Sequence, residues 1–432
     1  MAARRSPYQG LVPYDESDAP FFFGRERDTR LVIANLFASP LTLLYGPSGV
    51  GKSSLLHAGV VHALRCRGDV TAVTFREWQD DPLAGLKLAI AAASAVGKGE
   101  VPDPDASLLA LADGCVTGLQ RPLMVILDQF EERFLYARDT AFEDELAEAV
   151  NGLQVQASFL VSLRDDALAR LDVFEDRIPR LFDNYLRVEH LDRESARAAI
   201  CRPLDEYGAA YATAVTIEDP LVDAVLEQVQ AGHVVLGQSG RGVVRDSASP
   251  DEVRIETPFL QLVLQRLWDE EVATGSTRLR RATLERLGGA ERIVRSHLDR
   301  AMDALPADEQ LLAARAFHQL VTPSRTKIAH LPSDLAALEH VPRDALEDVL
   351  GKLAAVRILR PIAAPPGQPR ESRYEVFHDV LAPAILDWRA RFEQVRAHRK
   401  QQQQLSEELA AQEQRSRAAE AEVLREPTRT SA

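Results

Sequence analysis

The chain has 432 residues, of which 46% are hydrophobic and 27% charged, which is typical of folded globular proteins and excludes a disordered chain. Its 51 Lys and Arg against 65 Asp and Glu leave a net charge of −14, which disfavours binding of nucleic acid or anionic membranes by the surface as a whole. The three cysteines are far apart and no apolar run is long enough to span a membrane, so we expect a cytoplasmic protein.

Helix-like and strand-like stretches alternate over residues 24–191, after a lead segment over residues 1–23. We predict helices over 26–37, 82–96, 107–118 and 141–151, and strands over 41–45, 69–75, 123–127, 157–166 and 185–191. This alternation is typical of an α/β fold in which helices cover both faces of a parallel sheet.

The stretch "GPSGVGKSS", residues 46–54, follows the first strand and opens a helical run, and it fits G-x-x-x-x-G-K-[ST]. Such a loop points backbone N–H groups at phosphate oxygens, Lys52 supplies charge to the β- and γ-phosphates, and the Ser53 hydroxyl would complete a Mg²⁺ shell. A chance match in a turn is disfavoured by the flanking strand and helix. The predicted phosphate cradle comprises Gly46, Pro47, Ser48, Gly49, Val50, Gly51, Lys52, Ser53 and Ser54.

A second acidic motif, "LMVILDQFEER", places Asp128 directly after a strand that is apolar throughout. Asp128 would share the Mg²⁺ ion with Ser53, because ligands bind at the carboxyl ends of parallel strands. Either Glu131 or Glu132 could polarise a water, and we prefer Glu131 slightly. The neutral Gln129 is a poor base, so hydrolysis could be slow. The alternative is a core strand that ends in a helix-capping aspartate.

The remaining chain reads as three further parts. Residues 192–290 carry amphipathic helical patterns, interrupted by a polar loop over 237–252, and predict an all-α helical domain. Residues 291–390 predict helices followed by two strands, which indicates a winged-helix domain. Residues 391–432 predict a polar helical or weakly coiled-coil tail, because apolar spacing fades after the pair Leu405 and Leu409.

Six stretches in a fixed order resemble the STAND class of P-loop NTPases, and more narrowly the bacterial "novel STAND NTPase 1" domain, which is related to AAA+ ATPases and to NB-ARC proteins. They are "PYQGLVPYDESDAPFFFGRERD", "GPSGVGKSSLLHAGVV", "LDQFEER", "VSLRDD", "TPFLQLVLQRLW" and "YEVFHDVL", within residues 7–390. The resemblance implies an ATP/ADP-operated signalling switch with Mg²⁺, in which three domains surround one nucleotide. ATP is expected over GTP only through this resemblance.

The resemblance implies a role for the pair His378 and Asp379 in binding the nucleotide. In NB-ARC-like relatives, a histidine at this place in the winged helix contacts the β-phosphate of ADP and holds the closed state. A histidine beside phosphate forms a charge-assisted hydrogen bond that joins a distant domain to the ligand. The alternative is that His378 and Asp379 only cap the following helix.

Other site residues follow from the resemblance with alternatives open. Gly24, Arg25 and Glu26 match the part of the family that lines the adenine pocket, although a turn and a helix start explain them too. Arg164 matches a sensor arginine that reaches the γ-phosphate, or it pairs with a neighbouring aspartate on the surface. Pro258 packs on adenine, or is a proline at a helix start.

Three functions remain open from the sequence. The first is a switch that hydrolyses ATP slowly and self-associates, or acts on a separate sensor or effector protein. The second is a scaffold that holds nucleotide without turnover. The third is a DNA-handling AAA+-like ATPase, which ranks last because residues 301–390 contain ten Lys and Arg against twelve Asp and Glu, whereas a DNA-reading wing is usually basic.

Overall fold

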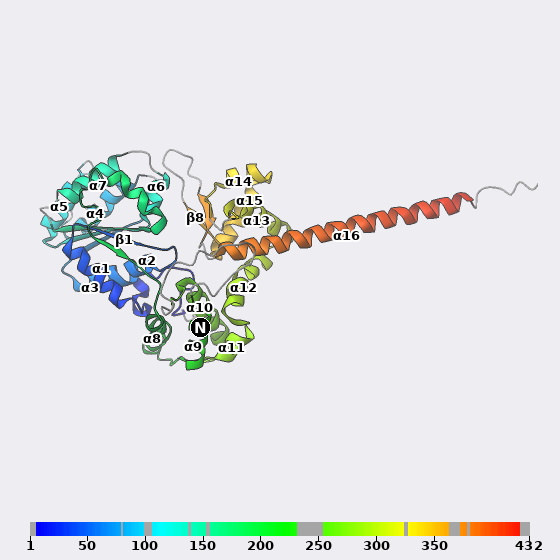
Figure 1. The fold of residues 1–432 in the computed structure, drawn as a ribbon, viewed down its shortest axis with the longest axis horizontal. Coiled ribbons are helices and arrows are strands. Elements are labelled where there is room, and N and C mark those ends of the chain that lie inside the picture. Colours follow the sequence, from blue (N-terminus) through cyan, green and yellow to red (C-terminus); the bar gives the residue numbers. More distant parts are fainter. Residues whose placement is uncertain are drawn as a thin grey trace, which may run out of the picture.

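The structure is a computed structural model of the chain. It describes residues 6–78, 81–98, 106–136, 140–152, 156–230, 254–323, 327–362, 372–377 and 381–423. Three parts surround a common centre, and one long helix projects from them (Figure 1). The predicted polar loop over 237–252 lies outside the described residues.

The first part is built on a five-stranded parallel sheet of order β2-β3-β4-β1-β5, which confirms the predicted parallel sheet. The strands are β1 Leu41–Gly46, β2 Thr71–Phe75, β3 Leu123–Leu127, β4 Ala157–Arg164 and β5 Tyr185–Arg187. β4 lies between β1 and β3 and pairs with both. Because all pairings are parallel, the loop after β1 and the residues after β3 and β4 meet at one edge of the sheet.

Helices cover both faces of this sheet, as the alternation predicts (Figure 1). Leu123, Val125 and Leu127 pack in one apolar cluster with α4, α5 and α7, whereas Met124 and Ile126 pack in another with α1 and the helix after β1. A strand buried on both faces must be apolar at every position. The covering segments are α1 Glu26–Ala38, α2 Lys52–Ser54, the π-helical η2 Leu55–Val61, α3 His62–Arg67, α4 Pro82–Lys98, α5 Leu108–Leu119 and α7 Ala141–Asn151.

Short segments complete the first part. They are the 3₁₀ helices η1 Glu16–Phe21, η3 Phe130–Glu132 and η4 Asp165–Phe174, together with α6 Arg133–Tyr136. η1 begins at a reciprocal cap, in which the Asp15 carboxylate accepts from Ser17 N at 2.7 Å and Asp18 Oδ2 accepts from Asp15 N at 3.1 Å. This cap stabilises the start of η1.

The second part is helical. It contains α8 Arg193–Tyr211, α9 Asp219–Gln228, α10 Thr257–Ala273, α11 Arg281–Arg286 and α12 Gly289–Asp303, with a small parallel pair of β6 Thr216–Ile217 and β7 Arg278–Leu279. α8 begins where the Asp192 carboxylate accepts from Ser195 N at 2.7 Å. The N-terminal segment packs here, since the Tyr8 hydroxyl donates to the carbonyl oxygen of Ile200 at 2.7 Å.

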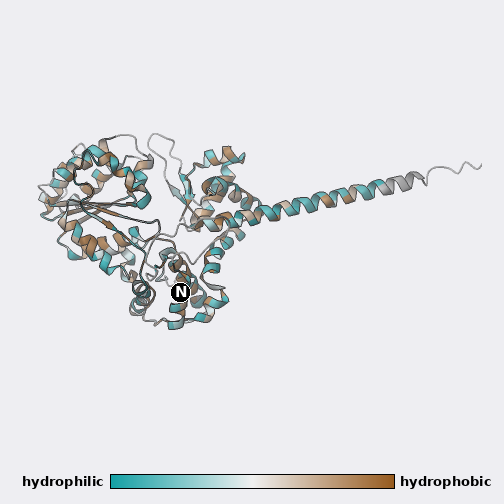
Figure 2. Ribbon diagram, in the orientation of Figure 1, coloured by the Kyte–Doolittle hydropathy of each residue, from teal (hydrophilic) through white to brown (hydrophobic). Residues whose placement is uncertain are grey.

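The third part contains α13 Ala307–Leu320, α14 Pro332–Glu339, α15 Arg343–Ala355 and the antiparallel strands β8 Leu359–Ile362 and β9 Arg373–Val376. A bridge from His330 to Tyr374 adds an extended residue beside β9. α16 Ala382–Val423 follows and projects away from the body, and the part of it that Figure 2 colours is largely hydrophilic.

The second and third parts are not separated by a break in the core. One buried apolar cluster runs from Tyr8 through α8–α12 to α16. α12 crosses the expected boundary between residues 290 and 291, and α16 crosses that between residues 390 and 391. Within the described parts of the chain, no helix has the length and apolar composition that a membrane span requires.

Candidate functional site

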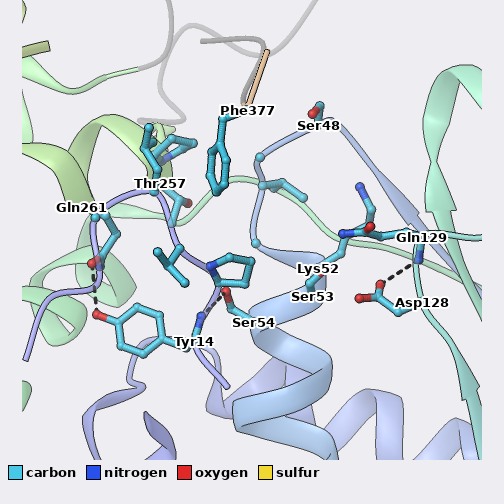
Figure 3. Close-up of a pocket in the computed structure, with 18 of the residues that line it drawn as sticks. Tyr14, Ser48, Lys52, Ser53, Ser54, Asp128, Gln129, Thr257, Gln261 and Phe377 are labelled. Atoms are coloured by element: carbon cyan, nitrogen blue, oxygen red, sulfur yellow. Dashed lines mark hydrogen bonds between the residues drawn. The ribbon is translucent and has the colours of Figure 1, made fainter. Parts of the chain in front are cut away.

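A cavity of about 650 Å³ opens where the three parts meet. Its walls come from the N-terminal segment, the loop after β1, the ends of β2, β3 and β4, the start of α10, and the β8–β9 hairpin. Figure 3 shows Lys52, Ser53 and Asp128 toward one end of this cavity, and Thr257, Gln261 and Phe377 toward the other. The cavity therefore has an end rich in charged groups and an end with apolar and amide groups.

The loop after β1 supplies the first wall. Ser48 through Ser54 of the predicted phosphate cradle line the cavity, whereas Gly46 and Pro47 are not among its lining residues. Gly51 has φ of 101°, a backbone conformation that favours glycine. The Lys52 ammonium donates to the carbonyl oxygens of Gly46 and Pro47 at 2.7 and 3.0 Å. Burial lowers the pKa of Lys52, although the carboxylates of Glu131 and Asp128 oppose that shift.

Arg25 holds this loop through a hydrogen bond. It is buried, its guanidinium donates to the Val50 carbonyl oxygen at 2.8 Å and to Asp28 at 2.7 Å, and it lines the cavity. Gly24 and Glu26 do not line the cavity. Gly24 N donates to Glu26 Oε2 at 3.0 Å, and Glu26 accepts from Arg202 of α8 at 2.6 Å. These two residues attach α1 to the helical part.

Asp128 stands at the end of β3, is 1% exposed, and faces the loop. Its Oδ2 lies 3.3 Å from His57 Nε2, and Trp78 Nε1 donates to its backbone carbonyl at 2.8 Å. Burial would raise the pKa of Asp128, but hydrogen bonds from His57 and Ser53 outweigh it, so this pKa lies below its usual value. Asp128 therefore stays a carboxylate beside the Ser53 hydroxyl, as a Mg²⁺ site requires.

The two glutamates after β3 differ in their contacts. Glu131 lines the cavity, and among the described residues its buried Oε2 has no hydrogen-bond partner. Burial raises its pKa. Glu132 also lines the cavity, but its Oε1 lies 3.4 Å from a guanidinium nitrogen of Arg360, which is in β8. Burial raises the pKa of Glu132 to about 7. Glu131 is therefore the freer of the two to act on a bound water.

Arg164, at the end of β4, lines the cavity and also pairs with Asp166 through two bonds of 3.1 and 2.9 Å. The structure thus contains features of both readings, the sensor and the surface pair. Pro258 lies in the first turn of α10 and lines the opposite end of the cavity. The helix-start position is thus observed, and packing of Pro258 on adenine stays a prediction.

Three groups of residues at the site were not predicted from the sequence. The N-terminal segment lines the cavity from Gly10 to Tyr14, and Tyr14 donates its backbone N–H to Ser54 Oγ at 3.1 Å and its hydroxyl to Gln261 Oε1 at 3.0 Å. His57 follows Ser53 by four residues on the same helix, a spacing that could have indicated it. The basic residues Lys327 and Arg360 come from the third part.

His378 and Asp379 lie outside the described residues. Phe377, the residue directly before them, lines the cavity beside Thr257 (Figure 3). The chain at this point therefore reaches the cavity from the third part, and the role of His378 stays a prediction.

The geometry fits a nucleotide with Mg²⁺. The loop offers backbone N–H groups and Lys52, the pair Ser53 and Asp128 offers hard oxygen ligands, and Glu131 offers a buried carboxylate oxygen that lacks a partner among the described side chains. A phosphate-binding loop after β1, an acid after β3 and a strand between them define a P-loop NTPase.

The model of the family "Novel STAND NTPase 1" matches residues 7–420, and the chain belongs to this family. No curated protein matches the sequence. Among solved structures, the ORC2 protein of Aeropyrum pernix, in ADPNP–ADP complexes, is similar at 13% identity and a TM-score of 0.45, over 92% of this chain and 99% of that chain.

Two further structures show comparable similarity. The Aeropyrum pernix ORC1 protein, solved in complex with DNA, has 15% identity and a TM-score of 0.41, over 89% of this chain and 98% of that chain. A Walker-type ATPase of Pyrococcus abyssi has 15% identity and a TM-score of 0.42, over 87% and 98%.

Proposed function

We propose that the protein is an ATP/ADP-operated switch that hydrolyses ATP slowly. The observation that carries the proposal is that one cavity is lined by all three parts of the chain. A nucleotide bound there contacts the loop after β1, the start of α10 and the β8–β9 hairpin together. Loss or exchange of its terminal phosphate then changes the contacts that hold the third part against the first.

In this proposal the chain's residues divide the work. The loop N–H groups and Lys52 bind the phosphates, Ser53 and Asp128 hold Mg²⁺, and Glu131 accepts a proton from the attacking water. The metal supplies charge neutralisation at the phosphates when bound. Arg164, at the end of β4, is placed to contact the terminal phosphate, with Asp166 fixing its orientation.

We also propose domain roles for the parts. Residues 24–191 form the NTPase domain, 192–290 the helical domain and 291–390 a winged-helix domain, with 391–432 as a helical tail. The order α13, the extended residue His330, α14, α15, β8 and β9 supports the winged helix, and the isolated bridge from His330 to Tyr374 adds one extended residue beside the hairpin. Self-association, or a separate sensor or effector, would read the open state.

The test is to purify the chain, denature it, and identify the released nucleotide by chromatography. We expect bound ADP or ATP in the wild type and none in Lys52→Ala. Lys87→Ala is the matched control, because Lys87 pairs with Glu145 in a partly buried ion pair of the first part and does not line the cavity. Equal nucleotide content in wild type and Lys52→Ala would refute the site.

The predicted latch has a separate test. His378→Ala should speed the spontaneous exchange of bound ADP, measured by release of a fluorescent ADP analogue into excess unlabelled ADP. An unchanged rate returns His378 to the role of a helix cap. If the wild-type protein binds ATP but does not hydrolyse it, the nucleotide-holding scaffold is favoured over the slow ATPase.

A further inference from the structure

The cavity contains a second set of cations that the phosphate loop does not supply. Arg360 of β8 and Lys327, before α14, both line it together with Glu132 and Glu375. Arg360 and Glu132 are 228 residues apart in the chain. Their contact therefore joins the first part of the protein to the third, inside the space proposed to bind nucleotide.

The contacts of Arg360 are unequal. Its guanidinium lies 2.6 Å from Glu375 Oε1, on the neighbouring strand β9, and 3.4 Å from Glu132 Oε1. The same Glu375 oxygen accepts from Lys327 Nζ at 2.9 Å. Glu375 thus fixes Arg360 firmly within the third part, whereas the bond to Glu132 is longer than an ordinary hydrogen bond. Glu132 is the contact that an incoming anion can replace.

The position of Glu132 makes such a replacement relevant to the phosphates. It directly follows Glu131, whose carboxylate interacts electrostatically with Lys52 of the loop and with Arg360. The Arg360 side chain is already partly buried, with 29% of its surface exposed, so a phosphate oxygen that takes the place of Glu132 needs only part of the desolvation that a fully exposed arginine would need. Guanidinium groups bind phosphate oxygens in a fork that ammonium groups lack.

We propose that Arg360 is a specificity-determining residue that binds the terminal phosphate of a nucleoside triphosphate in exchange for Glu132. This inference rests on the proposed nucleotide site. With a diphosphate, Arg360 stays on Glu132 and the third part is held through that pair. With a triphosphate, Arg360 binds the ligand directly. The hairpin thereby distinguishes the two nucleotides.

The test compares two variants that break the same ion pair from opposite sides. Nucleotide-free full-length protein is titrated by calorimetry with Mg²⁺ and either ADP or the β,γ-imido analogue of ATP. The pH is 8, above the Glu132 pKa of about 7, so that this carboxylate is charged. We expect Arg360→Gln to weaken binding of the triphosphate analogue about 10- to 100-fold and to change ADP affinity less than about threefold.

Glu132→Gln should act in the other direction, because it releases Arg360 from its competing carboxylate. We expect affinity for the triphosphate analogue to stay the same or to rise. Arg391→Gln is the matched control, since Arg391 pairs with Asp299 of α12 at 2.9 Å and does not line the cavity. Arg360→Lys is a second variant, for the case that Arg360→Gln folds poorly. It keeps the positive charge, so it should lose less affinity for the triphosphate analogue than removal of the charge does.

Two outcomes overturn the inference. Equal losses for ADP and the triphosphate analogue in Arg360→Gln, or the same loss in Glu132→Gln, would mean that the pair only braces the two parts. No binding of either nucleotide by the wild type would instead refute the proposed function itself, and Lys52→Ala would then be indistinguishable from wild type. The two failures are therefore separate.

Discussion

Replacing Glu131 with glutamine tests which of two adjacent carboxylates, Glu131 or Glu132, activates water. Glutamine has nearly the same shape, so the cavity keeps its volume, but it cannot accept a proton. Because the buried Oε2 of Glu131 has no partner among the described groups, the substitution breaks no hydrogen bond at that atom. It also removes a carboxylate whose pKa burial has raised, so thermal stability should be unchanged or higher.

The expected size of the effect follows from the role. Loss of a positioned general base lowers the rate of the chemical step by about 100- to 10,000-fold. Glu132→Gln alters a carboxylate that contacts Arg360 at 3.4 Å, so it should change the hydrolysis rate by less than about 10-fold. The wild-type rate should fall as pH decreases through the raised Glu131 pKa, because the base becomes protonated at a higher pH than an ordinary glutamate.

The assay is single-turnover hydrolysis of radiolabelled ATP with protein in excess, which separates the chemical step from product release. Binding of ATP is measured in parallel, and Glu131→Gln should retain it and trap ATP. Glu131 is not the base if Glu131→Gln hydrolyses ATP at the wild-type rate, or if Glu132→Gln loses as much activity as Glu131→Gln does. The second result would move the base to Glu132.

Three further outcomes are expected. Gly24→Ala, at φ of 86° and with its Cβ overlapping a carbonyl oxygen of α8, should destabilise the fold by about 2–4 kcal/mol in urea unfolding, against about 1 kcal/mol for Gly68→Ala, where φ is 72° but the space is open. Trp78→Phe leaves the Asp128 carbonyl without its 2.8 Å donor, and should cost about 1–3 kcal/mol and lower the thermal midpoint. Folding raises the Glu132 pKa from 4.5 to about 7, so wild-type stability should fall by up to about 3 kcal/mol as pH rises through that range, and Glu132→Gln should remove this pH dependence.

The sheet could be predicted because its signals are local. Strand β3 matches the predicted residues 123–127, since burial on both faces demands an unbroken apolar run. Helix α7 likewise matches 141–151. The loop after β1 carries its own motif, and the parallel order of the sheet brings it to Asp128 without further information.

The remaining walls of the cavity could not be predicted because they depend on how distant parts pack. Nothing near Arg360 in the sequence indicates that it meets Glu132, which lies 228 residues earlier. The N-terminal segment reads as a lead segment, yet Tyr14 reaches both Ser54 and Gln261. Side-chain contacts between parts are set by tertiary packing, which local periodicity does not encode.

Helix α16 begins in the third part and extends far beyond it (Figure 1). Leu381, Ile385 and Trp388 are buried in the core shared with α13, which anchors the start of the helix to that part. Residues 393–415 are exposed throughout. From Phe392 to Val423 the helix is about 45 Å long, at about 1.5 Å per residue, so a rotation of the third part by about 10° displaces its far end by roughly 8 Å. If the proposed switch rotates the third part, this helix would act as a lever arm that enlarges the displacement at its far end.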